Sequence, residues 1–118
     1  MSCQYASGAN GVAIAPTSQK RVLSHLVCNS SAEPITGAWI LAKGGINASG
    51  ALSVRLLNEL GSPITDFVDV FGSSSSKVKF PRLRMNIDDF PQTITVEAHN
   101  RSNAAGSTAY VLGVLYTQ

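Results

Sequence analysis

Apolar and polar residues alternate along much of this chain, and the alternation is clearest at residues 92–100. In the stretch QTITVEAHN, Ile94, Val96 and Ala98 occupy every second position, with polar residues between them. Successive side chains of a β-strand point to opposite faces, so this pattern predicts a strand with one buried face and one wet face. Glu97 is expected on the wet face.

The same alternation recurs at residues 76–80, whereas the last predicted strand is apolar at nearly every position. In SKVKF, Val78 and Phe80 are expected to point inward and Lys77 and Lys79 outward. The stretch AYVLGVLYT within residues 107–117 is apolar on both faces. A strand of this kind must be covered on both sides, so we expect it to lie in the centre of a sheet or against another subunit.

Clusters of Gly, Pro, Asn and Ser interrupt the alternation at intervals of roughly 8 to 14 residues, which is typical of an all-β sandwich or barrel. The leucines within residues 52–60 also fit helical spacing, but Gly50 and Gly61 close that window early, and the neighbouring segments favour a strand. We therefore predict a single-domain antiparallel β-sandwich of about eight strands, jelly-roll-like or immunoglobulin-like. The expected strands are Gly11–Ala15, Lys20–Asn29, Gly37–Lys43, Leu52–Asn58, Thr65–Phe71, Lys77–Leu83, Gln92–Asn100 and Ser107–Thr117.

Length and composition agree with one packed domain. The chain has 118 residues, enough for one hydrophobic core, and its charged fraction of 14% is below the average of about 25%. The net charge of +2 is spread without runs of like charge, so we expect no nucleic-acid partner. No apolar stretch is long enough to span a membrane, and the N-terminus lacks a signal-peptide pattern. We expect synthesis in a cytoplasm and no membrane partner.

Residues 1–10 are small or polar and show no period, so we expect an extended N-terminal arm that precedes a β-sandwich domain at 11–118. An arm of this kind reaches other subunits, and Gln4 and Tyr5 are its candidate partner contacts. The two cysteines, Cys3 and Cys28, are too few for a disulfide framework.

Residues that could perform catalysis or bind a metal are sparse. His25 and His99 fall within predicted strands, and the chain contains none of the closely spaced His and Cys motifs of metal sites. The acidic pair Asp88 and Asp89 is interpreted as a turn former, because the calcium-loop pattern is missing. Ser24 and His25 are adjacent in a strand and so point to opposite faces. We expect no enzyme activity, no cofactor and no metal.

Four basic residues within a short stretch, Lys77, Lys79, Arg82 and Arg84, have two interpretations. They form a solvated strand face, or they contact an acidic partner surface, for which arginine offers bidentate pairing with carboxylates. Trp39, the single tryptophan, is expected in the core rather than on the surface as a platform for sugars. The predicted core includes Ile94, Val96, Leu112, Val114 and Trp39.

The segment QKRVLSHLVCNSSAEPITGAWIL at 19–41 contains a basic-flanked strand, an Asn-Ser turn in VCNSSAEPIT at 27–36, and a second strand. Together with the closing TAYVLGVLYTQ, it resembles small β-sandwich virion proteins of tailed bacteriophages. The resemblance covers about half of the chain by residue type, and it carries over no binding residues because this class has no fixed site motif.

The resemblance implies a structural protein of a phage particle, in capsid decoration, at the head-to-tail connection or in the tail. Such a protein would form a homo-oligomer, a trimer or a ring, and would dock on virion proteins such as the major capsid or tail protein. Its location would be the virion, after synthesis in the host cytoplasm. The alternative is a carbohydrate-binding β-sandwich module, which should expose two or more coplanar aromatic side chains.

Overall fold

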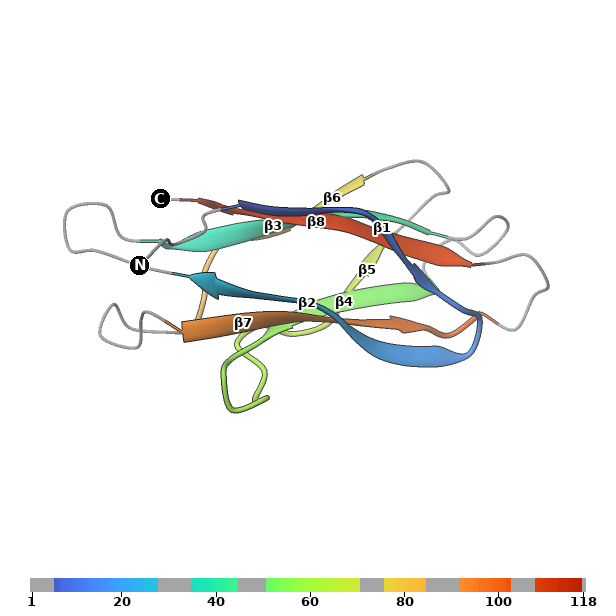
Figure 1. Ribbon diagram of the computed structural model, residues 1–118, viewed down its shortest axis with the longest axis horizontal. Helices are drawn as coiled ribbons and strands as arrows, with labels where there is room; N and C mark the ends of the chain where they lie inside the picture. Colours follow the sequence, from blue (N-terminus) through green and yellow to red (C-terminus); the bar gives the residue numbers. More distant parts are fainter. Residues whose placement is uncertain are drawn as a thin grey trace.

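The computed structural model describes residues 6–27, 35–44, 51–70, 76–84, 92–102 and 108–117. These residues form two four-stranded sheets packed face to face, and no helix occurs among them (Figure 1). The expected antiparallel β-sandwich is confirmed. The strands are β1 (Ala6–Ile14), β2 (Ser18–Val27), β3 (Gly37–Lys43), β4 (Leu52–Leu57), β5 (Val68–Val70), β6 (Ser76–Phe80), β7 (Gln92–Asn100) and β8 (Ala109–Thr117).

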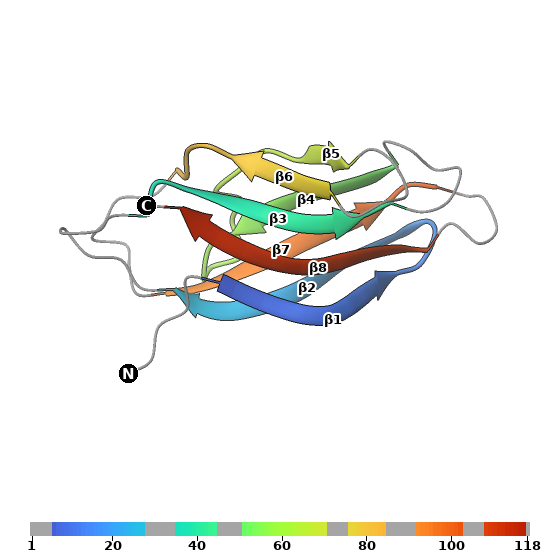
Figure 2. The same ribbon diagram turned by 90° about the horizontal axis from the view of Figure 1, so that it is seen from above.

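The strand order identifies the type of sandwich. Sheet A has the order β1-β8-β3-β6 and sheet B the order β2-β7-β4-β5, and all neighbours are antiparallel (Figure 2). The pairs β1 with β8, β2 with β7, β3 with β6 and β4 with β5 join the first half of the chain to the second half in reverse order. Rolled into two layers, such an antiparallel ribbon is a jelly roll. The structure thus selects the jelly-roll alternative over the immunoglobulin-like one.

The core lies between the sheets and follows the predicted alternation. Ile94, Val96 and Ala98 of β7 are each 0% exposed, as the sequence pattern predicts. Val78 and Phe80 are buried, whereas the lysines on either side of Val78 are exposed. β8 lies between β1 and β3, which confirms its central position in a sheet.

The prediction for the N-terminal segment needs a correction, because β1 begins at Ala6 instead of Gly11. Ala6, Ser7 and Gly8 are paired with β8, so residues 6–10 belong to sheet A and not to an arm. Strand pairing uses backbone groups, so an edge strand of small residues leaves no apolar alternation in the sequence. Residues 1–5, with Gln4 and Tyr5, lie outside the described residues.

Other strand ends differ from the predictions in smaller ways. β6 ends at Phe80 because Pro81, which follows it, has no N–H to donate to a ladder. β5 is shorter than expected and covers only Val68–Val70. β2 begins at Ser18, two residues before its predicted start, and the last two residues of the prediction, Cys28 and Asn29, lie outside the described residues.

Two predicted core residues are not in the core. Ile94, Val96 and Val114 are buried as expected, but Trp39 and Leu112 are only half-buried and do not pack in the core cluster. Leu112 lies at a register shift, since Leu41 pairs with Gly113 while the next residue of β3 pairs with Val111. A bulge of this kind leaves the extra residue unpaired and turns the side chains that follow.

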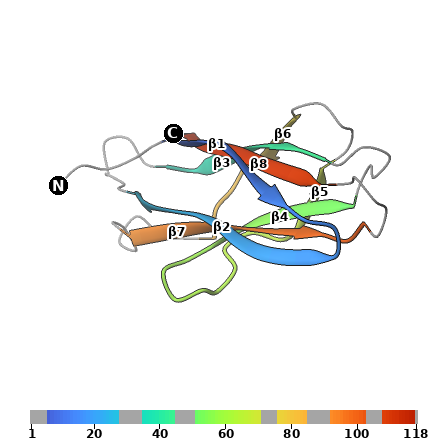
Figure 3. The ribbon, with the colours of Figure 1, turned by 45° about the vertical axis from the view of Figure 1, so that its right-hand side comes forward.

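The two layers are joined at the turn of residues 15–17, where the chain passes from β1 in sheet A to β2 in sheet B (Figure 3). Asn100 of β7 is 1% exposed, and its Nδ2 donates a hydrogen bond of 3.0 Å to the Ile14 carbonyl oxygen of β1. The backbone N–H of Thr17 donates to the Ser102 carbonyl oxygen at 2.9 Å. These bonds fix the position of one sheet over the other.

Candidate functional site

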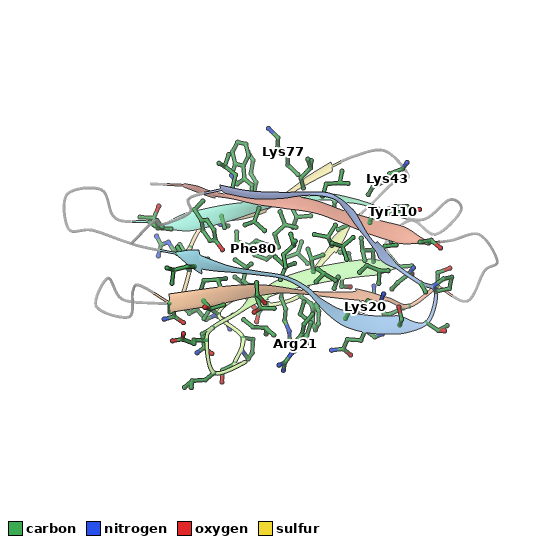
Figure 4. The ribbon with its side chains drawn as sticks, viewed as in Figure 1. Lys20, Arg21, Lys43, Lys77, Phe80 and Tyr110 are labelled. Carbon is green, nitrogen blue, oxygen red and sulfur yellow. The ribbon has the colours of Figure 1, made fainter. Side chains whose placement is uncertain are left out.

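The outer face of sheet A collects aromatic, aliphatic and basic side chains. Cα partners in an antiparallel pair share a face, so the register defines rows across this side of the sheet. One row is Lys79, Trp39 and Leu115, the next contains Lys77 and Leu41, and a third contains Lys43 and Tyr110. We call these seven residues the sheet A surface. In Figure 4, Lys77 and Lys43 point away from the sandwich above sheet A, whereas Phe80 lies between the layers.

Trp39 is the central aromatic residue of the sheet A surface. The Lys77 Nζ lies 4.6 Å from the centroid of its ring, and the Lys79 Nζ lies 5.0 Å from it. Both distances are within the range of a cation–π interaction, in which the negative face of the ring attracts an ammonium group. Leu115, opposite Trp39 on β8, is 47% exposed. The surface is therefore apolar and cationic at the same place.

A pocket of about 300 Å³ adjoins this surface at the edge of the sandwich, where β6 of sheet A meets the segment before β5. Lys79, Arg82 and Arg84 line it together with the apolar side chains of Val68, Phe80 and Pro81, and Thr65 and Asp66 complete the lining. Three of the four basic residues singled out in the sequence thus line one pocket. Lys79 belongs both to this pocket and to the surroundings of Trp39.

Among the described residues, the carboxylates that form ion pairs all pair with arginines, and one of these carboxylates, Asp66, lines the same pocket as Lys79. Arg84 Nη2 lies 2.7 Å from Asp66 Oδ1, and Arg101 Nη2 lies 3.0 Å from Asp69 Oδ1. The Ser53 hydroxyl donates to Asp69, and this bond, with help from Arg101, holds the pKa of that carboxyl below its usual value. Within the described part of the chain, no ion pair involves Lys43, Lys77 or Lys79.

The outer face of sheet B is organised differently, because the chain covers part of it. The segment at residues 58–67 leaves β4 below sheet B (Figure 1), and Leu57, on the outer side of β4, is only 1% exposed beneath it. Arg55 contacts Glu97 at 2.6 Å, and its guanidinium lies 4.2 Å from the centroid of the Phe67 ring. The expectation of a wet face at Glu97 is thus wrong, since its side chain points outward but the residue as a whole is only 6% exposed.

Only one of the two histidine side chains, that of His99, lies within the described residues. His99 is half-buried on the outer side of sheet B and pairs with Ser53 and Gln19 in register. The side chain of His25 lies outside the described residues, as do Asp88 and Asp89. Across the described ranges, no three His, Cys, Asp or Glu side chains come together in a group that could hold a metal ion. The same ranges contain no helix that is long and apolar enough to cross a membrane.

Sequence reasoning found the basic residues and missed the aromatic ones. Lys77, Lys79, Arg82 and Arg84 are brought to one edge of the sandwich as a group. Trp39 was missed because tryptophan is usually buried. The signal that finds it is the period of β3, in which Ala38, Ile40 and Ala42 are buried, so that Trp39 shares the outward positions with Lys43.

No protein-family description and no curated protein sequence matches this chain. Solved structures with the same architecture do match. A carbohydrate-binding module, CBM36 in complex with calcium and xylotriose, superposes with a TM-score of 0.56 at 13% identity, over 98% of this chain and 91% of that one. The CBM36-1 domain of a multidomain xylanase from the hindgut metagenome of Trinervitermes trinervoides superposes with a TM-score of 0.57 at 15% identity. The alignment covers 99% of this chain and 88% of that domain.

A third match is the insecticidal delta-endotoxin Cry8Ea1 from Bacillus thuringiensis, with a TM-score of 0.56 at 12% identity. The alignment covers 93% of this chain but only 20% of the toxin, so the likeness is to one part of that protein. At these identities the comparisons establish the fold, which is the β-sandwich shared with carbohydrate-binding modules.

Proposed function

We propose that this protein is a non-enzymatic carbohydrate-binding module, and that a saccharide rests on the sheet A surface around Trp39. The observation that carries the proposal is the position of Trp39, on the outer side of a sheet and not in the core. Tyr110 is half-buried on the same outer side of the sheet. Two aromatic residues, both half-buried, thus lie on one face, which favours a sugar-binding sandwich over a purely structural one.

The chemistry of the sheet A surface fits a sugar ring. The C–H face of a pyranose is apolar and packs on an aromatic ring, while its hydroxyl groups need polar partners around that ring. Lys77 and Lys79 offer donors at the ring, and Lys43 offers a donor beside Tyr110. The structures named above add support, since two of them are carbohydrate-binding modules and one of these is in complex with xylotriose.

Calcium in that complex has no counterpart among the described residues. Asp66 and Asp69, whose carboxylates are exposed, are each paired with an arginine, and the described ranges hold no group of three His, Cys, Asp or Glu side chains. We propose the aromatic and basic side chains of the sheet A surface as the binding residues.

The test is affinity electrophoresis of the protein in gels that contain soluble polysaccharides, with Trp39→Ala as the variant. The variant should bind at least about tenfold more weakly, because the stacking surface is lost. Phe67→Ala, which removes an aromatic side chain 38% exposed on the sheet B side, is the matched control and should bind normally. Retained binding by a folded Trp39→Ala protein, or no retardation by any polysaccharide, contradicts the proposal.

A second candidate is the structural subunit of a phage particle, and one observation favours it. Leu60 is 89% exposed at the tip of a turn that is held by hydrogen bonds. The Oδ1 atom of Asn58 accepts from the N–H groups of Leu60 and Ser62, both at 2.9 Å. An apolar side chain displayed on a pre-organised turn fits insertion into a second copy of the chain or another virion protein.

This candidate is tested by the mass of the pure protein in solution. Mass photometry should find a trimer or a ring, and Leu60→Ser should dissociate it without changing the melting temperature, since the leucine has almost no contacts to lose. A monomer that persists at micromolar concentration counts against the virion role and leaves the carbohydrate proposal as it stands.

A further inference from the structure

We infer that the saccharide held on the sheet A surface is acidic, with carboxylate or sulfate groups along its chain. This inference rests on the proposed function and narrows its ligand class. It is carried by one juxtaposition: two ammonium groups lie over the Trp39 ring, and one of them also lines a pocket that contains two arginines.

The first argument concerns access to the ring. Lys77 and Lys79 place their ammonium groups 4.6 and 5.0 Å from the centroid of the Trp39 ring. A sugar that stacks on this ring displaces at least one ammonium group from its cation–π contact. A neutral sugar offers that ammonium only hydroxyl groups, which replace water. An acidic sugar offers a carboxylate or sulfate, and the displaced ammonium gains a charge-assisted hydrogen bond.

The second argument concerns the charge around the ring. In the described ranges, the carboxylates found in ion pairs are Glu97, Asp66 and Asp69, and each pairs with an arginine. Lys43, Lys77 and Lys79 form no ion pair within the same ranges. The sheet A surface is therefore cationic where the sugar would lie, and a polyanion supplies the charge that complements it.

The third argument concerns the pocket beside the ring. Its volume of about 300 Å³ is at the lower end of the range for small-molecule sites, so it suits one sugar unit or its acidic group. Arg82 and Arg84 line it, Arg84 in an exposed ion pair with Asp66 of the same lining, and guanidinium groups bind carboxylate and sulfate through paired N–H donors. Because Lys79 reaches both places, one unit of a polymer rests on Trp39 while a neighbouring unit enters the pocket.

The experiment compares ligands that differ only in charge, by titration calorimetry with the full chain. Polygalacturonate and its methyl ester share one backbone, and dextran sulfate and dextran provide the same comparison for sulfate. Poly-glutamate and single-stranded DNA serve as polyanions without the sugar of interest. We expect the acidic member of at least one pair to bind at least about tenfold more tightly, with an affinity that falls as salt is added.

The variants distinguish the effect of the lysines at the Trp39 ring from the effect of positive charge elsewhere on the protein. Lys77→Gln with Lys79→Gln should bring the acidic and neutral polysaccharides to within about threefold of each other. Lys20→Gln removes the same kind of charge from β2 of sheet B and should leave the preference unchanged. Melting temperatures establish that each variant is folded.

Each remaining outcome is decisive. Equal binding of acidic and neutral polysaccharides overturns the inference and leaves the proposed function intact. Binding of poly-glutamate or DNA as tightly as the acidic polysaccharide, with no loss in Trp39→Ala, shows a general polyanion surface and overturns both. No binding of any polysaccharide also overturns both.

Discussion

At Glu97, one carboxylate is withdrawn from water and satisfied by a neighbour on the next strand. Arg55 Nε donates to its Oε1 at 2.7 Å, and the side chains of Arg55 and Glu97 are 25% and 8% exposed. Glu97→Gln leaves the guanidinium without its charged partner, so we expect the free energy of unfolding to fall by about 1 to 3 kcal/mol.

Arg84→Gln is the matched control, because it breaks the ion pair with Asp66, whose side chains are 58% and 82% exposed. That change should cost less than about 1 kcal/mol. Urea denaturation of both variants gives the comparison, and an equal loss of stability in the two would show that Glu97 contributes no more than a surface pair.

At Asp69, hydrogen bonding makes stability depend on pH. The Ser53 hydroxyl, followed by Arg101, lowers the pKa of this carboxyl from its usual 3.8. Because the folded-state pKa is the lower one, the stabilisation is complete above the unfolded value and is lost as the pH falls through the folded value. We expect Asp69→Asn to lower the melting temperature at pH 7 and to have a smaller effect as the pH falls below 3.8. A difference that is as large well below this value as at pH 7 would exclude this linkage.

Residues whose environment is set by a distant segment could not be assigned from the sequence. The alternation in QTITVEAHN correctly places Glu97 on the outer side. The low exposure of Glu97 is explained by Arg55, which pairs with it and in turn contacts Phe67, and both of these residues are distant from Glu97 in the sequence. Trp39 was misassigned because its residue type favours burial, whereas its position in the alternation of β3 points outward. The alternation is the better guide at this position.

At the scale of elements, the jelly roll depends on contacts that join its two layers. Asn100 of β7 is such a contact, since its Nδ2 donates to the Ile14 carbonyl oxygen of β1 and its Oδ1 accepts from the Ser102 N–H at 3.1 Å. Asn100→Ala leaves these buried backbone groups without that partner, and we expect a loss of about 1 to 3 kcal/mol in the free energy of unfolding. Ser24→Ala, which removes an exposed hydrogen bond to Thr95, is the control and should cost less than about 1 kcal/mol. An unchanged midpoint for Asn100→Ala in thermal denaturation would contradict this role.

The bounds of β3 and β7 were predicted correctly. The predicted start of β1 was too late, because residues 6–10, ASGAN, are small or polar and show no apolar alternation in the sequence. The residues of β8 that point outward were not predicted. The bulge at Leu112 and Gly113 shifts the alternation between the two faces by one residue, and the apolar sequence gives no sign of this shift. The jelly-roll topology could not be predicted from the sequence either, because it depends on which strands pair with each other, and many of these pairs are far apart in the chain.

At the scale of the whole molecule, the two outer faces of the sandwich differ in how far the chain covers them. Sheet B is partly covered by residues 58–67, and its residues Arg55 and Asp69 form ion pairs within the chain. Sheet A presents Trp39, Leu115 and three lysines that have no ion pair among the described residues. Two of its three lysines, Lys77 and Lys79, were singled out in the sequence, whereas Lys43 and the aromatic residues were not. Together they make sheet A the binding face in our account.

The most direct test of that claim is the fluorescence of Trp39, the single tryptophan of the chain, during titration with polygalacturonate. We predict that its emission changes and saturates at the ligand concentration at which calorimetry also saturates, because the sugar displaces Lys77 or Lys79 from the indole ring. Binding detected by calorimetry with no change in Trp39 emission would place the ligand elsewhere on the molecule and would contradict the account.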